Sequence, residues 1–113
     1  MSEAHVNGAE FSLGNWIVRP NRDCIEQDGR VVRLAPKAMS VLLCLARASG
    51  EVVSRQALFD CVWPACEVTD DALTQRIGEL RKALGDSARN PEFIETIPKV
   101  GFRLIQPGRP LDT

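Results

Sequence analysis

The stretch that begins at Thr69 constrains the fold more than any other part of this 113-residue chain. Four apolar side chains in it recur at the spacing of a single helix face, namely Leu73, Ile77, Leu80 and Leu84. Thr69 is suited to be the N-cap of a helix over residues 70–84, and Gly85 is suited to end it. The chain then continues into a predicted β-hairpin, in which residues 93–97 pair with residues 102–105. The sequence therefore predicts an amphipathic helix that leads directly into a hairpin.

The amino-terminal part of the chain has the pattern of short strands. Brief apolar runs follow one another over residues 11–34, and the dipeptide Asp28-Gly29 separates two of them. An Asp-Gly turn favours a β-hairpin because both of its residues adopt positive φ. We therefore expect a small antiparallel sheet in this region.

Two more helices are predicted between this sheet and the third helix. Pro36 presets the backbone for a first helical turn, apolar residues recur at helical spacing after it, and Gly50 supplies a left-handed stop. This pattern predicts a helix over residues 36–49. Ser54 is suited to cap a second, short helix that ends at Pro64. The expected fold class is α+β: an antiparallel sheet, a three-helix bundle and a carboxyl-terminal hairpin.

Length and composition fit one globular domain with one core, because a chain of 113 residues with 44% hydrophobic residues lies below the size at which chains usually split. We expect residues 1–9 to be a flexible tail, residues 10–106 to be the domain, and residues 107–113 to be a linker or tail. No run of about 18 apolar residues occurs, and the amino terminus lacks the profile of a secretion signal. The segment itself is expected to be soluble and cytoplasmic, without membrane contact.

The charge is unevenly distributed along the chain. The formal net charge is −1, which by itself argues against a nucleic-acid partner. Between Ala72 and Arg109, however, seven basic residues stand against four acidic ones, a local balance of +3. The helix and hairpin near the carboxyl end are therefore the cationic part of the chain.

The face of the third helix opposite its apolar stripe is polar. It carries Asp71, Gln75, Gly78, Glu79 and Lys82, with Thr74 and Arg81 on one flank and Arg76 on the other. A DNA major groove is about 12 Å wide and admits one helix. Gln75 suits an adenine edge, and Glu79 can accept a hydrogen bond from cytosine, whereas Arg76, Arg81 and Lys82 suit phosphates.

The same face taken alone fits an ordinary solvated helix surface. Gly78 has no side chain and permits close approach of a groove. The hairpin that follows adds Lys99 and Arg103, which can reach a neighbouring minor groove or its phosphates. Helix and hairpin together favour duplex DNA as the partner.

Several sequence motifs resemble one known family. Residues 34–37 (Leu-Ala-Pro-Lys), 52–58, 62–63, 80–86 and 94–104 closely resemble, in this order, the OmpR/PhoB-type winged-helix effector domain. The connection over residues 86–91 and the Ile-Pro-Lys turn resemble the ToxR/CadC branch most. The resemblance extends over residues 11–105, nearly the whole chain.

The resemblance implies a four-stranded amino-terminal sheet, a third helix (residues 70–84) in the major groove and a wing (residues 93–105) at the adjacent minor groove. Together with the helix face, it gives this set of DNA-binding residues: Trp63, Thr74, Gln75, Arg76, Gly78, Glu79, Arg81, Lys82, Thr96, Lys99 and Arg103. It implies a bacterial-type transcription regulator that binds double-stranded DNA at tandem half-sites and self-associates weakly there. RNA polymerase is implied as a partner of the loop between helices two and three, and a receiver domain or a membrane-anchored sensor as the attached part.

Two other functions fit parts of the sequence. A thiol-based redox or metal-sensing module would use Cys61 and Cys66, joined by Cys24 or Cys44. Zinc sites usually combine closely spaced ligand pairs and often use histidine, whereas the only histidine of this chain is in the expected tail. A winged helix can also dock a protein, and an acidic residue at the centre of the exposed helix face would favour that function.

Catalysis is not expected. The sequence contains no glycine-rich phosphate loop, and its single histidine has no nucleophile motif nearby. The acidic pair Asp70-Asp71 is explained by favourable charge at a helix start. We therefore expect no enzyme activity, no cofactor and no metal site.

Overall fold

The computed structural model describes residues 10–106 and 108–110, and it has the winged-helix architecture expected from the sequence. Four strands follow one another as an antiparallel meander: β1 (Phe11–Leu13), β2 (Trp16–Arg19), β3 (Cys24–Gln27) and β4 (Arg30–Arg33). A short 3-10 turn, η2 (Pro20–Arg22), connects β2 to β3. The helices are α1 (Pro36–Arg47), α2 (Arg55–Val62) and α3 (Asp70–Leu84).

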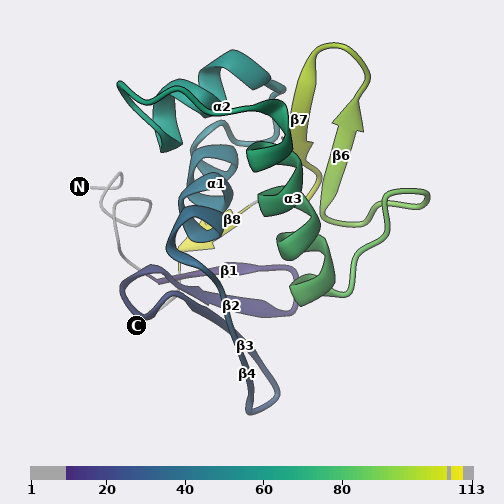
Figure 1. Cartoon of the computed structure of the whole chain (residues 1–113). Coiled ribbons are helices and arrows are strands. Elements are labelled where there is room, and N and C mark those ends of the chain that lie inside the picture. Colours follow the sequence, from purple (N-terminus) through teal and green to yellow (C-terminus); the bar gives the residue numbers. More distant parts are fainter. Residues whose placement is uncertain (1–9, 107, 111–113) are drawn as a thin grey trace.

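A second sheet forms the wing. It consists of β5 (Val53–Ser54), β7 (Gly101–Leu104) and β6 (Ile94–Ile97), in the order β5-β7-β6 with antiparallel pairing. Figure 1 shows the helices between the two sheets, with the amino-terminal sheet below them and the β6–β7 hairpin beside α3. The helices thus bury apolar faces against both sheets, and one core serves the whole fold.

Local sequence signals account for most of the element boundaries. Asp28 and Gly29 have φ values of 51° and 80°, as the predicted hairpin turn between β3 and β4 requires. The Ser54 side chain accepts a hydrogen bond from the backbone N–H of Ala57 at 3.0 Å and so caps α2. Gly85 ends α3 in the left-handed conformation, with φ of 73°. These three predictions are confirmed.

Three details at helix ends differ from the expectation. The first helix ends at Arg47 and not at residue 49, because Ser49 already has positive φ ahead of Gly50. The second ends at Val62, since the backbone leaves the helical region one residue before Pro64. Thr69 occupies the N-cap position of α3, but only its backbone carbonyl takes part, by accepting from the Ala72 N–H.

The carboxyl-terminal boundary of the domain is also corrected. Residues 108–110, which were expected to be linker, form strand β8 (Gly108–Pro110) and pair antiparallel with β1. The first sheet therefore has five strands, in the order β4-β3-β2-β1-β8, where four were expected. The proline and glycine content that predicts a linker is compatible with a short edge strand. The expected tail over residues 1–9 and residues 107 and 111–113 lie outside the described part.

The pairing of β5 with β7 depends on one glycine. Val53 and Ser54 pair with Phe102 and Gly101, which places the β5 backbone directly against Gly101. A methyl group at Gly101 would overlap the Val53 carbonyl oxygen and the backbone around it. Glycine is therefore required for this close approach, through which the wing attaches to the start of α2.

The connection from α3 to β6 is organised by Asp86. Its carboxylate accepts backbone N–H bonds from Glu92 at 2.7 Å, Ile94 at 2.9 Å and Phe93 at 3.2 Å. Burial acts to raise the pKa of Asp86, but these hydrogen bonds to the ionised form outweigh it and hold the pKa below its ordinary value. The charged carboxylate thus fixes where the wing begins.

Two glycines provide a matched test of backbone space. Gly101→Ala should destabilise the domain by about 1–3 kcal/mol, because the new methyl group forces β5 away from β7. Gly78→Ala should instead stabilise it by about 0.5–1 kcal/mol, because Gly78 lies within α3 and has open space around it. Urea unfolding of both variants measures the difference, and equal midpoints would contradict the described packing of β5.

The stability of the domain should depend on the ionisation of Asp86. Because its folded-state pKa is depressed, its contribution is fully present above the unfolded-state pKa and is lost as the pH falls through the folded-state pKa. Asp86→Asn should lower the stability at neutral pH and reduce the loss between about pH 5 and pH 2. Thermal unfolding across that range tests this, with Asp23→Asn as the control, and parallel pH profiles for wild type and Asp86→Asn would contradict it.

Candidate nucleic-acid interface

The outer face of α3 is available to a partner over part of its length. Leu73, Ile77, Leu80 and Leu84 are buried in the core, as predicted from their spacing. On the other side, the exposed residues of the predicted set are Thr74, Gln75, Gly78 and Lys82. A Cβ at Gly78 would meet no atom within 4 Å, so the helix surface is open there. These four residues form the exposed row of α3.

The wing presents its turn to solvent. Lys99 lies between β6 and β7 with φ of 66°, and both it and its neighbour Val100 are exposed. The turn is held by the Val100 N–H, which donates to the Ile97 carbonyl at 3.0 Å, and by the Arg55 N–H, which donates to the Val100 carbonyl at 3.2 Å. Thr96 is exposed on β6. The ammonium group of Lys99 is thus carried at the tip of an anchored hairpin.

Glu79 does not belong to the exposed row, contrary to the prediction. It is half-buried, and its carboxylate accepts the backbone N–H of Ala35 at 2.7 Å. Ala35 is the N-cap residue of α1, so Glu79 serves the role that a glutamate in the first turn of α1 would have in a capping box. The other carboxylate oxygen lies 3.5 Å from the Arg76 guanidinium. The Glu79 side chain thus bonds within the protein, and its charge partly neutralises that of Arg76.

Arg81, which was expected at a phosphate, reaches the wing. Its Nη2 donates to the Ile94 carbonyl and to the Thr96 hydroxyl, both at 2.9 Å. Burial lowers the pKa of Arg81 and the charge of Asp86 opposes that effect, while its Nε is enclosed and has no hydrogen-bond partner among the described residues. The side chain therefore bridges α3 and β6.

Arg103 is also engaged within the protein. Its Nε donates to the Glu95 carboxylate at 2.7 Å across the β6–β7 pair, and its Nη1 donates to the Gly50 carbonyl at 3.2 Å. The cross-strand ion pair is partly exposed and compensates the arginine charge. The wing thus keeps its predicted cation at the tip, whereas the one on β7 is paired.

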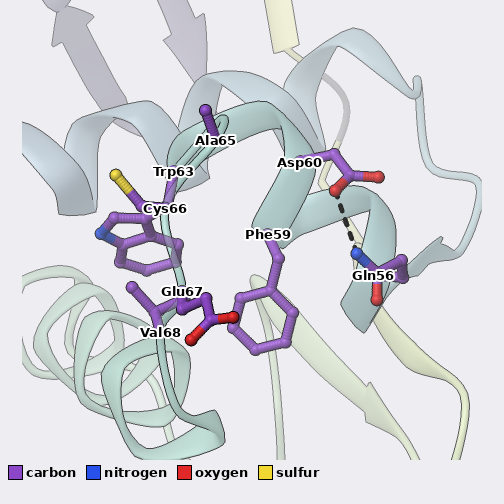
Figure 2. Close-up of a pocket in the computed structure, with 8 residues that line it drawn as sticks. All are labelled: Gln56, Phe59, Asp60, Trp63, Ala65, Cys66, Glu67 and Val68. Carbon is purple, nitrogen blue, oxygen red and sulfur yellow. Dashed lines mark hydrogen bonds between the residues drawn. The ribbon is translucent and has the colours of Figure 1, made fainter.

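Trp63 stands at the end of α2, next to an open groove. Its ring lies 6.1 Å from that of Phe59, centroid to centroid, with an angle of 45° between the planes. The groove has a volume of about 620 Å³. Figure 2 shows both aromatic rings among the residues that line it. The residues that line it are Gln56, Phe59, Asp60, Trp63, Ala65, Cys66, Glu67 and Val68. The connection between α2 and α3 thus offers an aromatic surface with acidic residues beside it.

Sequence reasoning missed Arg55. Its guanidinium lies over the Phe102 ring, 5.3 Å from the centroid, and approaches the Asp70 carboxylate to 3.8 Å. This places a cation where the starts of α2 and α3 meet the wing. The position directly after the Ser54 cap was the available signal, but only the β5–β7 pairing brings it next to Phe102.

The cysteines do not form a ligand cluster. Cys61 and Cys66 are exposed, and Cys24 is buried. Burial and a side-chain hydrogen bond with Cys61 raise the pKa of Cys44 to about 12, so Cys44 carries a thiol at neutral pH. In residues 10–106 and 108–110, no group of three or more His, Cys, Asp and Glu side chains is placed to hold a metal ion. Across that same part, the helices are too short or too polar to span a bilayer.

Comparison with known proteins places the chain in a family. The family described as "Transcriptional regulatory protein, C terminal" matches residues 29–104. The transcriptional activator CadC of Escherichia coli K12 is 42% identical over 96 residues, which are 84% of this chain and 19% of CadC. A cholera toxin homolog transcriptional activator of Vibrio parahaemolyticus is 44% identical over 104 residues, 87% of this chain and 36% of that protein. The chain thus spans about a fifth to a third of these relatives.

Solved structures agree with the sequence comparison. The DNA-binding domain of Escherichia coli CadC superposes with a TM-score of 0.81 at 38% identity, covering 90% of this chain and 96% of that one. The RstA DNA-binding domain of Klebsiella pneumoniae, in complex with the RstA box, gives a TM-score of 0.72 at 26% identity, covering 84% of this chain and 95% of that one. With its exposed α3 row, its anchored wing and these matches, the chain belongs to the family of transcriptional regulatory protein C-terminal domains, the OmpR/PhoB type that its motifs resemble.

Proposed function

We propose that this chain is a sequence-specific double-stranded DNA-binding domain of a transcription regulator. The observation that carries the proposal is the row of exposed polar residues on α3, with its open surface at Gly78, next to a wing that holds Lys99 at its tip. The RstA DNA-binding domain, which shares this fold, was solved in complex with the RstA box, and this supports DNA as the partner here.

In the proposed complex, α3 lies in the major groove and the wing lies at the neighbouring minor groove. The Gln75 amide can make paired hydrogen bonds to an adenine edge, and Gly78 lets the helix backbone approach the bases closely. Lys82 and Lys99 would neutralise phosphates, with Thr96 as a hydroxyl donor beside the wing. Phosphate contacts position the domain, and base contacts give it sequence preference.

The other charged residues of the predicted set receive supporting roles in this proposal. Glu79 holds the start of α1, and Arg103 joins the two strands of the wing. Because few cations are left free on the binding face, we expect moderate, salt-sensitive affinity with a shallow slope of log K against log salt, since few counterions are released. Trp63 and Arg55, at the two ends of α2, are proposed to lie close to the DNA backbone.

The proposed partners follow from the use of such a domain in a longer protein. Tandem half-sites would bring two copies side by side with weak contacts between them. The groove beside Phe59 and Trp63 is proposed as the contact for RNA polymerase, because it joins apolar rings to acidic residues. The chain spans only a fraction of the length of the relatives that it matches. We propose that it is the cytoplasmic domain of a membrane-anchored regulator, in which it is attached to a sensor segment.

Base reading and phosphate contact should separate in two substitutions. Gln75→Ala should lose preference at one or two base pairs, worth about 1–3 kcal/mol, because the bidentate amide contact is removed. Lys99→Ala should weaken binding to all duplexes equally and reduce the slope of log K against log salt by about 1. Selection from random duplexes, followed by titration at several salt concentrations, measures both effects.

The control variant for these two substitutions lies in the amino-terminal sheet, away from α3 and the wing. Arg30→Ala removes an exposed cation from the β4 strand and should leave affinity and salt slope unchanged. Gln75→Ala with an unchanged preferred site would refute the base-reading role. No retardation of any selected duplex by the wild type would refute the DNA-binding function itself and would favour protein docking.

Gly78 offers a second, independent check. Gly78→Ala is accommodated within the free protein, so any loss of affinity must come from the bound partner. If a groove floor approaches this point, the variant should bind its preferred duplex more weakly while it unfolds at higher urea concentration. Unchanged affinity, measured by fluorescence anisotropy, would place the DNA elsewhere on the helix.

A further inference from the structure

Arg81 and Asp86 act on the same residue of the wing. The Arg81 guanidinium donates to the Ile94 carbonyl, and the Asp86 carboxylate accepts the Ile94 N–H, each at 2.9 Å. The backbone adds a third link, since the Asp86 N–H donates to the Arg81 carbonyl at 2.7 Å. Both polar backbone groups of the first residue of β6 are therefore held by side chains, one from the last turn of α3 and one from just beyond its end.

A second hydrogen bond of Arg81 attaches α3 to β6 further along the strand. The same Nη2 donates to the Thr96 hydroxyl at 2.9 Å, two residues further toward the wing tip. Two attachment points on one strand constrain its direction relative to α3 more than a single bond does. The third helix and β6 are thus joined by a short, charged strut.

An arginine that binds a DNA phosphate would be arranged differently. The nitrogens of its guanidinium group would face solvent in the free protein, where water stabilises the positive charge. In Arg81, Nη2 is already committed and Nε is shielded from solvent, and burial of the group lowers its pKa. The cost of this partial burial is offset by bonds to the wing, which points to a structural use of the charge.

We infer that Arg81, together with Asp86, sets the orientation of the wing relative to α3, and that Arg81 is a positioning residue for DNA binding. The inference rests on the proposed function for its effect on DNA, but the orientation itself is a property of the free domain. From Ile94 to Lys99 the wing extends on the order of 15 Å at about 3.3 Å per residue. A rotation of about 10° at the base would move the tip by roughly 3 Å, enough to break a phosphate contact made by Lys99.

A double-mutant cycle on duplex binding tests the role. Lys99→Ala should weaken the wild type, but it should cost at least about threefold less in the Arg81→Met background, because the wing tip no longer meets its phosphate there. The salt slope should fall by about 1 in Arg81→Met, as in Lys99→Ala, and by no more than that in the double variant, because all three lose the same phosphate contact. Arg89→Met, an exposed arginine in the same connection, is the matched control and should leave the Lys99 effect intact.

Thr96→Val covers the case in which Arg81→Met fails to fold. It removes only one of the two strut bonds and keeps the shape of the side chain, so a smaller loss of the Lys99 effect is expected. Residual dipolar couplings of β6 and β7 amides relative to α3 amides provide a readout without DNA, and they should shift in Thr96→Val and in Arg81→Met.

The outcomes distinguish the inference from the proposed function. Unchanged dipolar couplings, or a full Lys99 effect in both variants, would overturn the positioning role. A salt slope that falls by about 2 in the Arg81→Met, Lys99→Ala double variant would show that Arg81 is itself a phosphate ligand, leaving the proposed function intact. If the wild type binds no duplex, the proposed function fails, and shifted couplings would still establish Arg81 as the determinant of wing orientation.

Discussion

Burial of one face of α3 is the constraint on which the rest of the structure depends. Its four apolar side chains each contribute about 1.5–3 kcal/mol when removed from water, and no other orientation of the helix buries them together. This burial places the helix against α1 and leaves the polar row outside. It also brings the carboxyl end of α3 to the wing, where Arg81 and Asp86 attach it to β6.

Around this helix, charged side chains are divided between two tasks. Those near the core connect elements. Glu79 joins α3 to α1, Arg81 joins α3 to β6, and Arg103 joins β7 to the turn at Gly50 that follows α1. Those at the rim, Lys82 and Lys99, remain available to a polyanion. A net negative chain can therefore present a cationic binding face without being basic overall.

Sequence patterns located the helices and hairpins well because each depends on local interactions. The Asp28-Gly29 turn, the Ser54 cap and the Gly85 stop are all determined by residues within a few positions of one another. The β8 strand and the two-residue β5 strand escaped prediction for the opposite reason. Their pairing partners, β1 and β7, lie far away in the chain, and a Gly-Arg-Pro segment has no pattern that predicts an edge strand.

The sequence by itself determined the fold class, the extent of α3 and which residues line its polar face, since helical periodicity and end signals are local and strong. Only the tertiary structure decided which of those residues are free. Glu79, Arg76 and Arg81 carry charges that any helical wheel places near the surface, yet each has a partner, and two of them, Glu79 and Arg81, are bonded to residues that the wheel does not contain. A charged side chain takes whichever hydrogen-bond partner the packed core brings within reach, and that partner becomes known only when the chain has folded.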